Sequence, residues 1–483
     1  MGLTPKQAAE IVNRLYSRLS RRRPSIAKRE DYFAGKHPLA FASPEWRKFH
    51  EDRFAGFSDN WCGVVARAAA ERTEVFGVRL GNDPDVQSPD EAQLWQDWMR
   101  VDGPAKSAQG YLQGTTTSTS YALVWGNAGD EPVLTWETPS QAIVDYDVET
   151  GEARYALKSW TDDDGEYATL YTPTEVWKLK RAKSLAGQTA LVLPASVSAS
   201  LLDGGWTERD EQPVITNPLG VIPLVEHPNR PLLGSGPISD IEGTIPMQDA
   251  ITLLWAYLFG AADFASLPAR VILGQEPPKM PILDANGQKI GEQVISADQL
   301  KNGRLLWLTG ENAKIDSWEP AKLDVFTEVV NVAVKHIASQ TQTPIHYIMG
   351  ELGNVNGETL TATELPLATK VRSGHKHLTS PTREVFRRFA LVRGSDAVAE
   401  ACRTAVVQWR NPETMSDAQV SDAASKDSTI GWPFPAILER RYGLSQPEIA
   451  RVMAQREAEQ ISDPIVAATR NLAAGTGNAP VGG

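Results

Sequence analysis

The chain has 483 residues and a mass of 52.8 kDa, which allows roughly three domains or one elongated subunit built of several parts. Its two cysteines, Cys62 and Cys402, are too few and too far apart for a disulfide framework or a cysteine metal site, so a reducing compartment is expected. The formal net charge of −12 argues against a tight DNA binder, because phosphate neutralisation needs clustered Lys and Arg.

The N-terminal part is predicted to combine helices with strands. Apolar residues at helical spacing cover residues 4–35 and return from Asn60 to Glu74, and VFGVRL then alternates as in a strand. Two shorter helices are predicted over Glu91–Met99 and Gly110–Ser120. From Tyr121 to about Val225, short β-rich runs are separated by Gly, Asp and Pro turns.

No segment of the sequence is predicted to enter a membrane. The N-terminal helix pattern lacks the apolar core of a signal peptide. The longest apolar run, Ala250 to Ala262, has 13 residues, which is too short to span a bilayer. We therefore expect a soluble protein.

The middle of the chain begins with a helix predicted over Ile238–Leu267. No Lys or Arg occurs between Arg230 and Arg270, so the polar positions of this helix are acidic or small. A surface of this composition repels polyanions. Its candidate acidic residues are Asp240, Glu242, Asp249 and Asp263.

A β-rich insertion over Arg270–Pro320 separates this helix from a second one, Leu323–Gln342, which Pro344 ends. A glycine loop follows, and then a long helical stretch from about Glu358 to Arg393. Its two prolines, at positions 366 and 381, are expected to kink or break it. Beyond it we predict a disordered tail and four short helices, which cover Asp396–Val407, Ser416–Ser425, Pro435–Tyr442 and Gln446–Glu459.

The loop HYIMGELGNVNGETLTATE, residues 346–364, has the glycines of a phosphate cradle but not its other parts. A P-loop needs GxxxxGK and then Ser or Thr, directly after a strand. Here Gly353 lies four residues before Gly357, Glu358 stands where Lys is required, and a predicted helix precedes the loop. The loop also has no Gly-x-Gly of the dinucleotide pattern. We therefore predict no nucleotide cofactor.

Catalytic and metal sites are likewise not predicted. His375 and His377 are two residues apart, so on a helix they point in nearly opposite directions and cannot hold one metal together. The segment TDDDGE lacks the alternating ligands and the distant Glu of a calcium loop. An enzyme that uses scattered carboxylates remains an alternative, but no acid–base pair stands out. A structural or binding role is favoured.

Two basic clusters interrupt the acidic background, one from Arg14 to Arg29 and one from Lys370 to Arg393. Such clusters are most often solvated helix faces, although the first could bind nucleic acid. The second could face DNA or contact a neighbouring subunit, and the surplus of acid in the chain favours the subunit contact. The candidate residues of the second cluster are Lys370, Arg372, Lys376, Arg383, Arg387 and Arg388.

The order of helix, β insertion, helix, glycine loop and long helix indicates an assembly. Two helices that flank a small β module can run antiparallel, which places the module at one tip and the loop at the other end. Many such subunits side by side would form the wall of a tube. Acidic and small residues on its inner face would let a polyanion pass without sticking.

Five segments carry a resemblance to a known family: YFAGKHPLAF, NWCGVVARAAAERTEVFGV, GSGPISDIEGTIPMQDAIT, PIHYIMGELGNVNGETL and VVQWRNPETMSDAQVSDAASK. In this order, over most of the chain, the sequence resembles the portal proteins of tailed double-stranded-DNA bacteriophages, of the siphophage type. The resemblance implies an α+β, mainly helical fold in an elongated subunit with wing, stem, clip and crown regions.

The resemblance also implies where these regions lie. The stem would consist of two helices with the clip inserted between them, and the loop after the second helix would project into a channel. The regions are the wing (1–235), stem helix 1 (236–268), the β-rich clip (269–320), stem helix 2 (321–343), the tunnel loop (344–357), the long kinked wing helix (358–394), the helical crown (395–460) and a flexible C-terminal tail (461–483).

The function implied is a ring of about twelve copies at one capsid vertex, through which double-stranded DNA is packaged and ejected without sequence specificity. The ring would contact the terminase large subunit, a head-completion or adaptor protein, and the major capsid and scaffolding proteins. It would be assembled in the bacterial cytoplasm, become part of the virion and have no enzymatic activity of its own. The alternative is another minor capsid or head-assembly protein without a DNA channel.

Two sets of site residues follow from this resemblance. The candidate DNA-facing residues of the tunnel loop are Gly353, Asn354, Val355, Asn356 and Gly357. The candidate residues of the clip that contact terminase or adaptor are Pro278, Lys279, Asp284 and Lys289.

Overall fold

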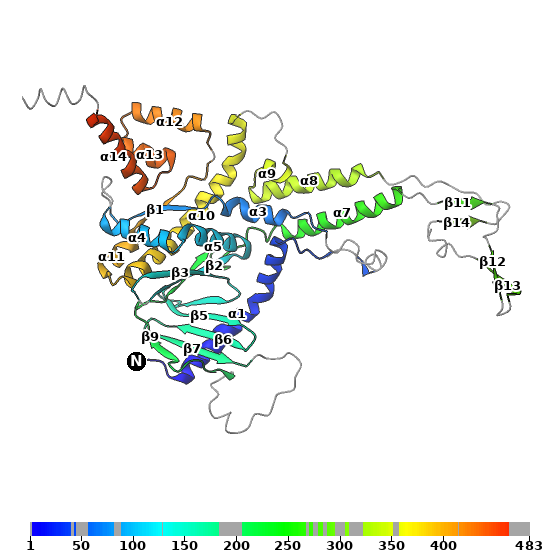
Figure 1. Ribbon diagram of the computed structural model, residues 1–483, viewed down its shortest axis with the longest axis horizontal. Coiled ribbons are helices and arrows are strands. Elements are labelled where there is room, and N and C mark those ends of the chain that lie inside the picture. Colours follow the sequence, from blue (N-terminus) through cyan, green and yellow to red (C-terminus); the bar gives the residue numbers. More distant parts are fainter. Residues whose placement is uncertain are drawn as a thin grey trace, which may run out of the picture. The chain divides into compact units, whose positions relative to one another are not determined.

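The computed structural model describes residues 2–39, 43–44, 57–81, 88–127, 129–182, 205–266, 270–273, 279–283, 287–294, 305–308, 322–350, 357–413 and 415–462. The chain divides into two compact units. The first contains residues 1–35, 60–244 and 338–483, and the second contains residues 36–59 and 245–337. Helices and strands occur in both units, which confirms the predicted α+β class (Figure 1).

In the first unit, helix α1 (Pro5–Phe33) lies against a six-stranded antiparallel sheet (Figure 1). Thr4 and Gln7 form a capping box at its start, and Pro5 suits the first turn because no N–H is needed there. The strands run in the order β4-β5-β6-β7-β8, with β9 also paired to β7. They are β4 (Ala142–Tyr146), β5 (Ala153–Thr161), β6 (Glu166–Tyr171), β7 (Glu175–Arg181), β8 (Thr207–Glu208) and β9 (Val214–Thr216).

Buried apolar side chains of α1 and this sheet form one core. Val12, Leu15 and Leu19 recur at helical spacing on α1 and are fully buried. They pack with Leu170 of β6 and Leu179 of β7. The predicted N-terminal helix and β-rich region are therefore confirmed, and their shared core follows from the two apolar patterns.

A second core surrounds helix α10 (Gly357–Val392) and the three-stranded antiparallel sheet β10-β2-β3. Trp98 lies against the rings of Phe386 and Phe389 with centroid separations of 5.4 and 6.4 Å. The other members of this part of the first unit are α3 (Trp61–Ala70), α4 (Pro89–Arg100), α5 (Gly103–Thr117), β2 (Thr119–Gly126), β3 (Pro132–Glu137), β10 (Leu224–Pro228) and α9 (Ile345–Met349).

Helix α10 continues through both of its prolines, Pro366 and Pro381, so they do not break it. The kink, which was the other predicted outcome, stays a prediction. Each proline removes one backbone donor, but the helix is held by buried side chains on both sides of each. Leu367 and Val371 pack against α3 residues, and Val385 and Phe386 lie in the second core. Tertiary packing of this kind outweighs a local proline effect.

The segment predicted as one helix over Asp396–Val407 is instead a short helix α11 (Asp396–Ala401), a 3-10 turn η3 (Cys402–Thr404) and a strand β15 (Val406–Trp409). Strand β15 pairs antiparallel with β1 (Val75–Arg79), from the other end of the chain. This pairing corrects the all-helical prediction for residues 395–460. Three helices follow, α12 (Asp417–Thr429), α13 (Phe434–Tyr442) and α14 (Gln446–Ser462).

The second unit contains α7 (Ile245–Ser266), most of α8 (Asp324–Thr341) and four short strands between them. Strand β11 (Arg270–Leu273) pairs parallel with β14 (Leu305–Leu308), and β12 (Lys279–Leu283) pairs antiparallel with β13 (Lys289–Val294). In the same unit, the side chains of Gln248 and Trp255 donate to the backbone and carboxylate oxygens of Asp59, at 2.6 and 2.9 Å. The predicted order of helix, β insertion and helix is confirmed.

Helix α7 begins seven residues later than the predicted Ile238, at Ile245. The reason is local. Pro246, the second residue of α7, fits the first turn of a helix, where its missing N–H is not needed, and Gly236 has a φ of +80°. The residues between them form turns whose backbone groups bond to side chains, as described next.

Candidate functional site

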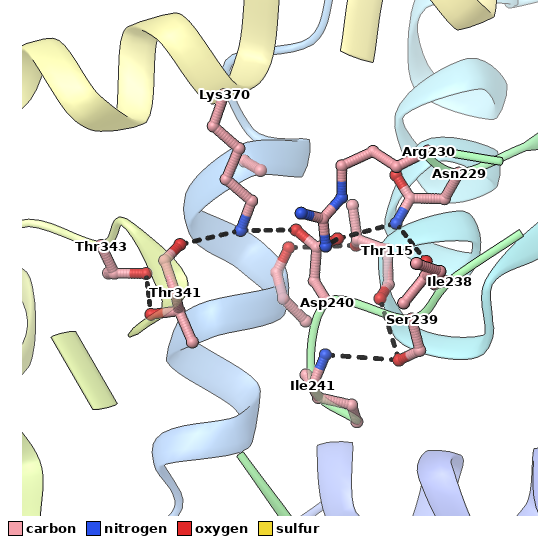
Figure 2. Close-up of polar contacts among 12 residues, drawn as sticks. Thr115, Asn229, Arg230, Ile238, Ser239, Asp240, Ile241, Thr341, Thr343 and Lys370 are labelled. Carbon is pink, nitrogen blue, oxygen red and sulfur yellow. Dashed lines mark hydrogen bonds and ion pairs between the residues drawn. The ribbon is translucent and has the colours of Figure 1, made fainter. Parts of the chain in front are cut away.

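A buried carboxylate, that of Asp240, organises the turn that leads into α7 (Figure 2). One of its oxygens accepts from Asn229 Nδ2 at 2.7 Å and Arg230 Nη2 at 2.6 Å. The other lies 2.7 Å from Lys370 Nζ on α10. Both oxygens of this carboxylate, whose side chain is 1% exposed, are thus held by donors, as a buried charge requires.

The backbone of the same turn is bonded to the end of α5. The amide of Asp240 donates to Thr115 O at 2.8 Å, and Ser239 Oγ donates to Thr116 O at 2.6 Å. Asn229 Nδ2 also donates to Ile238 O at 2.8 Å (Figure 2). Asn and Ser side chains of this kind offer the backbone an alternative to helix, which explains why residues 238–244 are not helical and why 240–244 form turns.

Lys370 also contacts the end of α8. Its Nζ donates to Thr341 O at 3.0 Å, and the Thr341 hydroxyl donates to Thr343 Oγ1 at 2.9 Å (Figure 2). The chain turns at Gln342, whose φ is +56°. A cation at a helix C-terminus stabilises the unpaired carbonyl groups there. Lys370 therefore bonds one carboxylate and one helix end.

A cavity of about 30 Å³ adjoins this site and is lined by Asp240, Lys370, Arg230, Tyr111 and other residues. Pockets for small molecules are usually about 300–1,000 Å³. The cavity is therefore too small for a cofactor, and the polar cluster around Asp240 is a structural site.

A second polar cluster lies around Arg72, directly after α3. Its guanidinium donates to Glu364 Oε2 of α10 and to Pro412 O, each at 3.0 Å, and it also donates to the Tyr347 hydroxyl on α9. His346 Nε2 lies 3.4 Å from the other oxygen of Glu364. The last described residues before the loop at 351–356 and the first turns of α10 after it are thus joined through Arg72.

Most of the basic residues predicted on α10 have partners within the chain. Their contact with DNA or with a neighbouring subunit stays a prediction. Arg383 Nε donates to Ala405 O, Arg372 pairs with Glu413, and Lys370 is buried as described. Arg387 and Arg388 lie 3.2 and 2.6 Å from Glu384. Lys376 is exposed.

The environment of Arg388 shows why the pairing of these basic side chains is structural. Its Nε donates to Ile222 O at 2.8 Å, and its side chain is 7% exposed. Burial lowers the pKa of Arg388, and Glu384 partly offsets that effect. Burial alone would raise the pKa of Glu384, but Arg388 and Arg387 outweigh it, so this pKa is lowered. A buried, internally paired guanidinium is not available to phosphate.

The arginines of α1 likewise point to the chain's own sheet. Arg14 lies 3.0 Å from Asp145, Arg22 donates to Ala142 O, and Arg23 donates to Ser140 O at 2.9 Å. Arg29 pairs with Glu242 at 2.6 Å. These contacts favour a structural role for the first basic cluster over the nucleic-acid binding that its sequence left open.

The four acidic residues predicted for the first stem helix separate into two groups. Asp240 and Glu242 precede α7, so their assignment to that helix is wrong. Asp249 and Asp263 lie on α7, and Asp249 is 8% exposed. Two of the four predicted acidic residues therefore lie on the helix.

The predicted loop and clip residues are partly described. Gly353, Asn354, Val355 and Asn356 lie outside the described residues, and Gly357 is the first residue of α10. Pro278 and Asp284 also lie outside them. Lys279 is on β12, and Lys289 is on β13, where it pairs with Glu292. Their predicted contacts with other proteins remain predictions.

Charge patterns along the sequence do not predict the two polar clusters. Asp240 and Lys370 belong to separate charge patterns, and Arg72 and Glu364 stand in neither. Their pairing depends on residues that are distant in the chain. The Ser239 and Asn229 side chains were the local clue, since such residues favour turns.

Two further features are absent from the residues that the structure describes. Across those ranges, no group of three or more His, Cys, Asp or Glu side chains is arranged to hold a metal ion. Among the helices that the structure describes, none is both long and apolar enough to cross a membrane.

The sequence is similar to phage portal proteins. Residues 13–457 match the family described as "Phage portal protein, SPP1 Gp6-like". The portal protein of Mycobacterium phage D29 is 26% identical over 377 residues, which cover 74% of this chain and 70% of that protein. The portal protein of Mycobacterium phage L5 is 27% identical over 379 residues, with the same two coverages.

Among solved structures, a chain from the virion of a native gene transfer agent particle is similar over 87% of this chain and 93% of its own length. The sequence identity is 11% and the TM-score is 0.36.

Proposed function

Because the chain belongs to the SPP1 Gp6-like family of phage portal proteins, we propose that it acts as a closed ring of about twelve copies around a channel for double-stranded DNA. The protein is a portal protein and hence a structural component of the phage virion. The ring would stand at one capsid vertex, where DNA enters during packaging and leaves during ejection.

The observation that carries this proposal is the match over residues 13–457, which includes α7, the strands β11 to β14 and α8 in one continuous stretch. Helix α7 bears no Lys or Arg, and its charged residues are Asp249 and Asp263. A channel lined by a helix without Lys or Arg would offer phosphate no cation to bind, so that DNA could move without breaking contacts at each step.

The parts of the subunit are proposed to divide this work. Helices α7 and α8 would form the stem, and the strands between them would form the clip that meets the terminase large subunit and later a head-completion or adaptor protein. Lys279 and Lys289 are the described clip candidates. Residues 1–235 and α10 would form the wing, and residues 395–460 the crown. Major capsid and scaffolding proteins would contact the outside of the ring.

The mass of the purified protein under native conditions tests the ring. Twelve chains of 52.8 kDa have a total mass of about 630 kDa, and electron micrographs should show a central hole. A stable monomer or dimer at high protein concentration would contradict the proposal. It would favour the alternative, a head-assembly protein without a channel.

The proposed DNA-facing loop is tested separately. Replacing Asn354, Val355 and Asn356 by Trp should reduce the length of DNA packaged into particles, while the same three positions replaced by Ser should not. Both variants should keep the native mass of the ring. If the Trp variant fails to form a ring, the loop is part of the subunit contact and does not line the channel.

A further inference from the structure

The chain crosses between its two units four times, and Lys370 contacts first-unit residues beside the two crossings that flank residues 245–337. It leaves the first unit after Thr244 and returns at Ala338. We call residues 238–244 the first root and residues 338–344 the second root of the segment 245–337, which is the arm. Lys370 Nζ lies 2.7 Å from Asp240 Oδ2 in the first root and donates to Thr341 O in the second at 3.0 Å (Figure 2).

We propose that Lys370 is a positioning residue that fastens both roots of the arm to α10. The proposal rests on the proposed function, in which α10 belongs to the wing and the arm forms the stem and clip. In that setting, a single ammonium group would hold together the two segments of the first unit from which the arm continues.

The chemistry of the site suits a residue that fastens both roots. An ammonium group can direct separate donors to a carboxylate and to a carbonyl. The Lys370 side chain is 4% exposed and that of Asp240 is 1% exposed, so water screens the pair little. An apolar side chain of similar length, such as Met, would fill the same space and donate nothing.

The two roots depend on Lys370 to different degrees. Asp240 keeps Asn229 and Arg230 as partners if Lys370 is lost, and its amide stays bonded to Thr115 O. In the second root, the described backbone bonds are local, from Gln342 N to Ser339 O and from Thr343 N to Ala338 O. Loss of Lys370 should therefore loosen the second root more than the first.

Hydrogen exchange measured by mass spectrometry on the full-length protein tests this order. In Lys370→Met, peptides that cover residues 338–344 should exchange about 10- to 100-fold faster than in the wild type, as expected for a lost bond to a charged group. Peptides that cover 238–244 should change less, and peptides from the sheet β4 to β7 should not change. Unchanged exchange at 338–344 in the folded variant would overturn the proposal.

Arg393→Met is the matched control. Arg393 binds Asp97 through two contacts of 2.6 and 3.1 Å, and the Asp97 side chain is also 1% exposed. This pair lies just after the end of α10 and away from both roots. If Arg393→Met accelerates exchange at 338–344 as much as Lys370→Met does, the effect is general destabilisation and the proposal fails.

Asp240→Asn provides the reciprocal variant, which removes the partner of Lys370 in the first root only. It removes the carboxylate but leaves the bond from Lys370 to Thr341 O, so exchange should rise at 238–244 and stay close to wild type at 338–344. Equal acceleration at both roots would contradict separate fastening by Lys370. The native mass of each sample is measured alongside. Absence of a ring would contradict the proposed function but not the role of Lys370 at the two roots.

Discussion

The ammonium group of Lys370 lies 2.7 Å from the carboxylate of Asp240, although 130 residues separate them in the sequence (370 − 240). Both side chains are almost completely buried, and Arg230 binds the second oxygen of the same carboxylate. The site therefore contains one anion and two cations, and its members are not equivalent.

The unequal roles of these charged groups predict which of two substitutions lowers the free energy of unfolding more. Asp240→Asn leaves two cations without their anion and should reduce the free energy of unfolding by about 3–5 kcal/mol. Lys370→Met leaves Asp240 paired with Arg230 and should cost less, about 1–3 kcal/mol. Urea unfolding at one protein concentration measures both. A larger loss in Lys370→Met would contradict this account of the site.

Two helical glycines should respond in opposite directions to alanine. A Cβ on Gly110 of α5 would lie 2.0 Å from Trp136 Cε3, so Gly110→Ala should destabilise by about 1–3 kcal/mol. A Cβ on Gly374 of α10 would meet nothing within 4 Å, so Gly374→Ala should stabilise by up to about 1 kcal/mol. Thermal unfolding of the two variants checks the signs, and equal signs would refute the packing argument.

His375 should make the fold sensitive to acid. Its ring stacks on Trp409 with a centroid distance of 4.6 Å, and burial, with Arg372 nearby, lowers its pKa from 6.5 to about 4. The unfolded chain therefore binds more protons than the fold between these two values. Stability falls as pH drops through 6.5, and the loss is complete below about 4.

The variant His375→Phe keeps the ring and removes this titration. Between pH 7 and pH 5, the wild type should lose about 2 kcal/mol more of its free energy of unfolding than the variant does. Burial also lowers the pKa of His227. Because both proteins contain His227, comparing them at each pH cancels its contribution. Parallel pH profiles for the two proteins would show that His375 already titrates normally in the fold.

Helix α1 offers neighbouring residues for a test of its role. Leu15 is fully buried in the core with the six-stranded sheet, so Leu15→Ala should cost about 2–5 kcal/mol. The Arg14 side chain is 55% exposed in its pair with Asp145, so Arg14→Ala should cost less than about 1 kcal/mol. Urea unfolding gives both values, and a larger effect of Arg14→Ala would show that the pair is stronger than its exposure indicates.

Much of the fold could be predicted because its signals are local. The apolar stripe of α1 has the helical repeat, the β-rich runs are bounded by turn residues, and α7 lacks basic residues throughout. The first strand, β1, was also predicted from the alternation in VFGVRL. Each of these patterns depends on the residues within one element.

The errors occur where distant residues decide. Val406 and Val407 were predicted as the end of a helix, yet they begin the strand β15 because β1 supplies its hydrogen-bonding partner. Asp240 looked like a stem-helix residue, yet it lies in a turn bonded to α5 and α10. Pro366 and Pro381 were expected to kink or break α10, yet buried neighbours keep the helix continuous through both.

The sequence by itself determined the helices and strands whose apolar repeat is strong, and the family to which the chain belongs. Only the tertiary structure decided what its charges do. Lys370, Arg383 and Arg388 looked like a basic surface, but each bonds a carbonyl oxygen of its own chain. The reason is that a charge pattern along a helix does not specify a partner, whereas burial requires one for every charged group.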